Sequence, residues 1–276
     1  MDTQQIIKQV EQKWLAPLID YNTSLFKKHP LPSHDYTHHQ RVWNFSRQIL
    51  QHLEDQLGAP NLNFTEKLII AVFFHDLGMV YNPGPKHGKA SRILCESYLE
   101  EKHLPLLANN PDLLNAIEQH DNKNYQLKEQ KELRLLPVLS LADDMDAYGT
   151  IGFFRYFEIY RIRKIPFHLI PIKALPNLHQ RFQLFENSYP WPDHFIKTHQ
   201  KRYLLTCNLF NQLREETSGK NEKPLVDFLK KFEHHAIDKK EDYSVLLKKL
   251  GQWEEIDFTV ELITNFKTEL SGKQSI

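Results

Sequence analysis

Apolar residues recur at helical spacing along most of the chain, whereas the alternation typical of strands is hard to find. Positions such as Ile6, Val10, Trp14 and Leu18 predict a helix over residues 3–28. The same spacing predicts further helices from Tyr36 to the turn at Gly58-Ala59-Pro60 and over residues 88–101, 110–120, 131–147, 150–163, 193–216, 224–235, 241–250 and 254–269. The expected fold class is therefore all-α.

Two apolar runs end in acidic residues. Residues 68–74 lead into His75-Asp76, and residues 133–142 lead into Asp143, Asp144 and Asp146. A carboxylate buried without a partner is costly, and the negative end of a helix makes its placement worse. A bound cation removes both penalties, although an Asp after an apolar run can also cap the next helix or pair with an Arg.

Capping residues, glycines and prolines predict where the helices begin and end. We expect Thr65 to cap the helix that leads to His75, with Gly78 just past its end. Prolines interrupt residues 165–176, which predicts an extended crossover there. The predicted division is an N-terminal helix over residues 1–29 packed on a core, a metal-binding core over residues 30–164, and a helical C-terminal extension over residues 165–276, packed on the core.

Composition narrows the class of protein. The 276 residues are 41% hydrophobic, which is enough for a sizeable core, and only 9 are glycine. The formal net charge is zero, with 35 basic and 35 acidic residues, so general binding to nucleic acid or to an anionic membrane is not expected. Cys95 and Cys207 are too few for a disulfide framework. No run approaches the roughly 18 apolar residues of a membrane span, and we expect a cytoplasmic protein with no membrane partner.

Two segments carry a resemblance to a known family. The first is His34-Asp35-Tyr36-Thr37-His38-His39-Gln40-Arg41-Val42, and the second is Ala142-Asp143-Asp144-Met145-Asp146-Ala147-Tyr148-Gly149-Thr150-Ile151-Gly152. With His75-Asp76 between them, they resemble the HD superfamily of metal-dependent phosphohydrolases, and in particular a bacterial subgroup with an HDxxHxxRV opening and an ADxxDAxGxxG closing motif. The resemblance covers about residues 30–160 and implies an HD-domain helical bundle with an additional C-terminal helical region.

The resemblance implies a metal site. Carried over position by position, it assigns His38, His75, Asp76 and Asp143 to one divalent cation. Two-metal members of the family use two more histidines in the interval that holds His87 and His120, with Asp76 as the natural bridge between the ions. His103 is a weaker substitute for His87. Imidazole and carboxylate ligands leave the element open among Mn, Fe, Co, Ni, Zn and Mg, as one or two ions.

The family further implies hydrolysis of a phosphate ester through a metal-bound hydroxide. Asp76 or Asp143 would orient the attacking water or accept its proton. The candidates for binding the phosphate of a small phosphorylated substrate are Arg41, Lys89, Lys123 and Arg155. Each of these four also fits an ordinary solvated side chain.

Two other functions stay open. Some relatives in this superfamily use a six-ligand di-iron site as an oxygenase, and a site that has lost catalysis can serve as a nucleotide-sensing module. Aromatic residues beyond position 165 are candidates for a lid over the site or for a homodimer contact, with core packing as the plainer alternative. These are Phe182, Phe185, Tyr189, Trp191 and Phe195.

Overall fold

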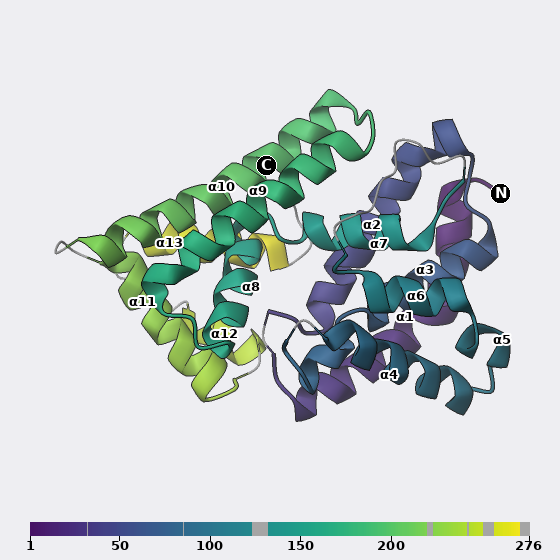
Figure 1. Ribbon diagram of the computed structural model, residues 1–276, viewed down its shortest axis with the longest axis horizontal. Coiled ribbons are helices and arrows are strands. Elements are labelled where there is room, and N and C mark those ends of the chain that lie inside the picture. Colours follow the sequence, from purple (N-terminus) through teal and green to yellow (C-terminus); the bar gives the residue numbers. More distant parts are fainter. Residues whose placement is uncertain are drawn as a thin grey trace. The chain divides into compact units, whose positions relative to one another are not determined.

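The computed structural model describes residues 1–31, 33–84, 86–122, 132–219, 223–241, 243–250 and 257–270. Within these ranges the chain is helical and has no strand, which confirms the all-α fold class (Figure 1). The chain forms two compact units. The first unit is Met1–His29, His34–Met145 and Leu184–Trp191, and the second is Pro30–Ser33, Asp146–Gln183 and Pro192–Ile276.

The helices of the first unit follow the predicted order. They are α1 (Thr3–Lys28), α2 (Tyr36–Leu57), α3 (Leu62–Phe74), α4 (His87–Glu101), α5 (Pro105–Ala108), α6 (Pro111–Gln119) and α7 (Leu135–Met145), with a 3-10 turn η1 (Leu77–Val80). Side-chain caps begin four of them, including α2 and α3: Asp35 accepts the amide of Thr37 at 2.9 Å, and Asn61 accepts the amide of Phe64 at 2.8 Å. The expectation that Thr65 caps α3 is wrong, because the helix begins earlier and Asn61 has the better-placed oxygen.

Helix α3 is the centre of the first unit. Every side chain from Leu68 to Phe74 is fully buried, as the unbroken apolar run predicts. The helix packs against α1, α2, α6 and α7, so apolar neighbours surround it. Its C-terminal end therefore delivers His75 and Asp76 into the interior of the unit.

The second unit is built around α8 (Gly149–Ile162), which packs on α10 (Asp193–Ser218) and α13 (Asp257–Leu270). The remaining elements are η2 (Phe167–Leu169), α9 (Ile170–Ser188, in this unit up to Gln183), α11 (Pro224–Glu233), the π-helical turn η3 (His234–Asp238) and α12 (Tyr243–Leu250). Phe154 lies 4.7 Å from the rings of both Phe232 and Phe266, which forms an aromatic core. Because α8 packs on these helices, the units divide after Met145, whereas the sequence places the division at Lys164.

The extended crossover expected over residues 165–176 is wrong. A 3-10 turn and the start of α9 occupy most of that stretch. Pro171 lies in the first turn, where its missing N–H is harmless, and only Pro176 interrupts the helix interior at a cost of about 3 kcal/mol. Buried apolar residues recur at helical spacing at Ile170, Ala174, Leu178, Phe182 and Phe185. Burying such side chains stabilises by about 1.5–3 kcal/mol for each large one, so the stripe outweighs the proline.

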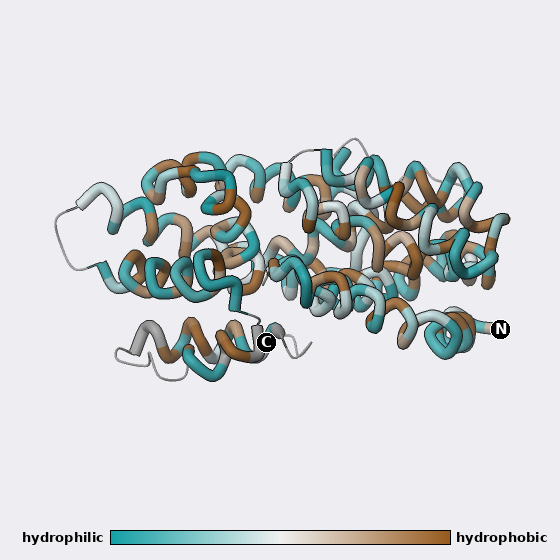
Figure 2. Tube along the Cα trace, turned by 90° about the horizontal axis from the view of Figure 1, so that it is seen from below, coloured by the Kyte–Doolittle hydropathy of each residue, from teal (hydrophilic) through white to brown (hydrophobic). Residues whose placement is uncertain are grey.

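Apolar and polar positions mix along the helices, as amphipathic packing requires (Figure 2). Across the described ranges, no helix combines the length and apolar character needed to cross a bilayer.

The N-terminus of α8 is tied to α13 through one carboxylate. Buried Glu269 accepts the amides of Thr150 at 3.1 Å and Ile151 at 3.0 Å, which satisfies two helix-end donors. Gly149 precedes them with φ +88°, and a Cβ there would lie 2.4 Å from a Glu269 oxygen. Glycine is required here both by the backbone conformation and by the carboxylate.

We expect Gly149→Ala to lower the free energy of unfolding by about 3 kcal/mol, from left-handed strain plus overlap with Glu269. The matched control is Gly58→Ala, because Gly58 also has positive φ (+77°) but open space around its Cβ position. That control should lose only about 1 kcal/mol. Chemical denaturation measures both, and equal losses would contradict the role of the carboxylate.

Candidate metal centre

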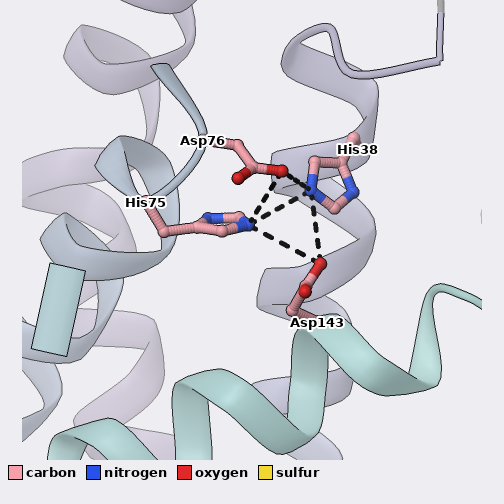
Figure 3. Close-up of side chains that lie close together, drawn as sticks. All are labelled: His38, His75, Asp76 and Asp143. Atoms are coloured by element: carbon pink, nitrogen blue, oxygen red, sulfur yellow. Dashed lines mark hydrogen bonds and ion pairs between the residues drawn. The ribbon is translucent and has the colours of Figure 1, made fainter. Parts of the chain in front are cut away.

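Four buried side chains converge in the first unit (Figure 3). His38 comes from α2, His75 and Asp76 from the end of α3, and Asp143 from α7. The His38 Nε2 atom lies 3.3 Å from Asp76 Oδ2 and 3.7 Å from Asp143 Oδ1. The His75 Nε2 atom lies 3.6 Å and 3.7 Å from the same two oxygens. Two imidazoles and two carboxylates thus share one small volume.

A second group shares Asp76 with the first. The Oδ1 atom of Asp76 lies 3.1 Å from Nε2 of His87, at the start of α4, and 3.1 Å from Nε2 of His120, just after α6. All three side chains are buried. The two oxygens of Asp76 therefore face different histidine pairs: Oδ2 faces His38 and His75, and Oδ1 faces His87 and His120. This is the arrangement of a carboxylate that bridges two positions.

Backbone carbonyls fix the tautomer of three histidines. Nδ1 of His75 lies 2.7 Å from the carbonyl of Val72, three residues earlier. Nδ1 of His87 and of His120 lies 2.8 Å from the carbonyl three residues before each. A carbonyl oxygen only accepts, so each Nδ1 donates its hydrogen, and in the neutral ring Nε2 carries a lone pair. These lone pairs face the centre of the site.

The donor set fits a cation. His38 Nε2 and His75 Nε2 are 3.2 Å apart, and His87 Nε2 and His120 Nε2 are 3.1 Å apart. Two neutral acceptors at that separation repel unless a proton or a metal ion lies between them. Imidazole nitrogens oriented by a hydrogen bond on the other ring nitrogen, together with carboxylates, are the usual ligands of Mn, Fe, Co, Ni and Zn. These buried groups can therefore hold a divalent metal, as expected from the sequence.

Neighbouring side chains shift the pKa values of Asp76 and His87 in opposite directions. Burial raises the pKa of Asp76, but the charge of His75 and the hydrogen bonds of the other histidines outweigh burial and hold the pKa well below its usual range. Burial lowers the pKa of His87, yet its hydrogen bond with Asp76 and the charges of Asp76 and Asp121 raise it to about 9. Asp76 is thus an anion at neutral pH.

The four candidate phosphate-binding residues have different surroundings. Arg41 is buried on α2, one turn after His38, and donates to Thr37 Oγ1 at 3.1 Å. Lys89 is exposed on α4, and Lys123 lies outside the described residues. Arg155 belongs to the second unit, where it pairs with Asp146 at 3.2 Å.

Two other histidines, His39 and His103, do not belong to either group. His103 is exposed, so the second group contains His87 instead. His39 is buried beside the site, with its Nδ1 on the carbonyl of Asp35 at 3.1 Å. Burial, with the neighbouring His38 and His75, holds the pKa of His39 well below its usual range, so it packs there as a neutral ring.

The sequence interpretation missed Asp121. Its Oδ2 lies 3.4 Å from Nε2 of His87. The available signal was the dipeptide His120-Asp121, which repeats the His75-Asp76 pair at the end of another helix.

Comparison with known proteins agrees with this geometry. A family model described as the HD domain matches residues 35–148. Residues 35–148 are an HD domain. All six residues of the two groups lie inside the HD domain, whereas Arg155 lies beyond it. No match was found among curated proteins or among solved structures. The bacterial subgroup named from the two sequence motifs stays a prediction.

Single substitutions in the HD domain should remove ions in a specific pattern. Asp143→Ala should lose the ion of the first group only, His87→Ala the ion of the second group only, and Asp76→Ala both, because only Asp76 serves both groups. The control is Asp112→Ala, which removes an exposed carboxylate from α6. Elemental analysis after dialysis measures the ions, and two ions retained by Asp76→Ala would contradict the shared role.

Metal affinity of the second group should rise with pH up to about 9. Below that pKa the metal-free His87 binds a proton that the cation must displace, and above it there is no such proton to release. Titrations with Mn²⁺ between about pH 6.5 and about pH 9 measure the effect. An affinity that does not change over this range would contradict the assignment of His87.

Proposed function

We propose that this protein is a metal-dependent phosphohydrolase that cleaves a phosphate ester of a nucleotide or another small phosphorylated molecule. The observation that carries the proposal is the position of Asp76, whose two oxygens each face a separate pair of histidines. Two cations about 3.5–4 Å apart are a recurring solution for displacement at phosphorus. The HD domain at residues 35–148 supports the same class of chemistry.

A divalent cation supplies a Lewis acid that lowers the pKa of water and polarises a phosphoryl oxygen. The side chains of the protein would hold the ions, orient the water and accept its proton. His38, His75, His87 and His120 would hold the ions through Nε2, with three of the rings oriented by backbone carbonyls. Asp143 and Asp76 are carboxylates in contact with the first pair of rings, where they can orient the attacking water and take its proton. The oxygen of water bonds to phosphorus, and the ester oxygen leaves with a proton.

Arg41 is the strongest candidate for binding the phosphate. It lies three residues after His38 on the same helix, and its guanidinium can hold two phosphate oxygens at once. It is buried, so its charge is less screened than that of a surface arginine. Lys89, Lys123 and Arg155 remain weaker candidates, and Arg155 already pairs with Asp146.

A di-iron oxygenase is the second candidate, because the same six ligands suit two iron ions. Bound iron and oxygen uptake that depends on a substrate would favour it over the hydrolase. A non-catalytic nucleotide-sensing module ranks third, since every ligand of both groups is in place.

A screen of nucleotides and sugar phosphates for phosphate release tests the hydrolase. The Mn²⁺-loaded protein should release phosphate or pyrophosphate from at least one compound, and Asp76→Asn should reduce the rate by a factor of about 10³ or more. Release that survives both metal removal and Asp76→Asn would point to a contaminating enzyme and contradict the proposal. Iron with oxygen uptake instead would move the oxygenase first.

Arg41→Ala should raise KM for that substrate by about tenfold to a hundredfold and leave metal content unchanged, because it removes a phosphate contact and no ligand. The matched control is Arg47→Ala, which removes an arginine from the same helix that pairs with Glu11 instead. Steady-state kinetics measure both variants. An unchanged kcat/KM in Arg41→Ala would remove Arg41 from the site.

A further inference from the structure

Asp121 lies at the edge of the second group, on the side of His87. It directly follows His120, and its carboxylate oxygen Oδ2 is 3.4 Å from His87 Nε2. The same Nε2 lies 3.1 Å from Asp76 Oδ1. Nε2 of His87 is therefore approached by two carboxylates, one just after α3 and one just after α6.

Exposure distinguishes Asp121 from the six buried residues. Its side chain is 47% exposed, against 7% for Asp76 and 4% for Asp143. An acidic residue with that exposure keeps its charge at little cost, whereas a buried one needs compensation. Asp121 thus brings negative charge to the solvent side of the second group without adding to the burial cost.

The second group is poor in oxygen ligands without Asp121. It contains two imidazoles and one oxygen of Asp76, whose other oxygen faces the first group. Hard divalent ions such as Mn²⁺ and Mg²⁺ prefer carboxylate and water oxygens, whereas Zn²⁺ accepts imidazole readily. A nearby carboxylate would therefore matter more for Mn²⁺ than for Zn²⁺.

We propose that Asp121 is a further residue of the second cation site, and that its carboxylate sets the affinity and metal preference of that site. The inference rests on the two-cation site of the proposed function. It concerns metal binding alone, so it stands or falls separately from the identity of the reaction.

The test is calorimetric titration of the full-length, metal-stripped protein with Mn²⁺ and with Zn²⁺. In Asp121→Asn, which keeps the shape and removes the charge, the second Mn²⁺ should bind about tenfold to a hundredfold more weakly, and the second Zn²⁺ should lose less. The first ion should bind as in the unaltered protein. Asp121→Ala should show the same order of effects.

Two control variants complete the test. Asp112→Asn removes an exposed carboxylate from α6, the helix that precedes Asp121, and should change neither ion, while His87→Ala should lose the second ion altogether. Unchanged binding of the second ion in Asp121→Asn would overturn the inference, as would equal weakening of both ions or uptake of only one ion by the unaltered protein. If Asp121→Asn weakens binding of the second ion but the unaltered protein releases no phosphate from any compound, only the hydrolase proposal is contradicted.

Discussion

The buried carboxylate of Asp76 is the constraint on which the first unit depends. Residues 68–74 of α3 are buried on every side, so the C-terminal end of this helix places Asp76 in the interior, where an uncompensated negative charge is costly. Four histidine Nε2 atoms from α2, α3, α4 and α6 lie within 3.6 Å of its oxygens. These four histidines can surround Asp76 only if the helices that carry them pack closely together. The packing of the first unit and the assembly of the site therefore depend on each other.

Much of this could be predicted from the sequence. Helical spacing gave the order of the helices, and the unbroken run ahead of His75 identified the buried helix and its acidic end. His38, His87, His120 and Asp143 are brought together as the resemblance implied. The preference for His87 over His103 was already made from the sequence. Asp121 needed the structure, because a contact between α4 and the turn after α6 leaves no periodic signal.

The errors have a common physical origin. Proline and threonine were interpreted by their local preferences, whereas longer-range packing decides the outcome. The stripe of buried residues on α9 tolerates Pro176, and Asn61 takes the capping position that Thr65 could have held. The grouping of α8 with α10 and α13 likewise follows from long-range aromatic contacts, Phe153 with Phe210 and Phe154 with Phe266, which no local pattern predicts.

Anomalous diffraction from a crystal of the Mn²⁺-loaded protein tests the central claim most directly. The account predicts two peaks about 3.5–4 Å apart, one among His38, His75 and Asp143 and the other beside His87 and His120, with Asp76 bound to both. A single peak, or two peaks that do not share Asp76, would contradict it.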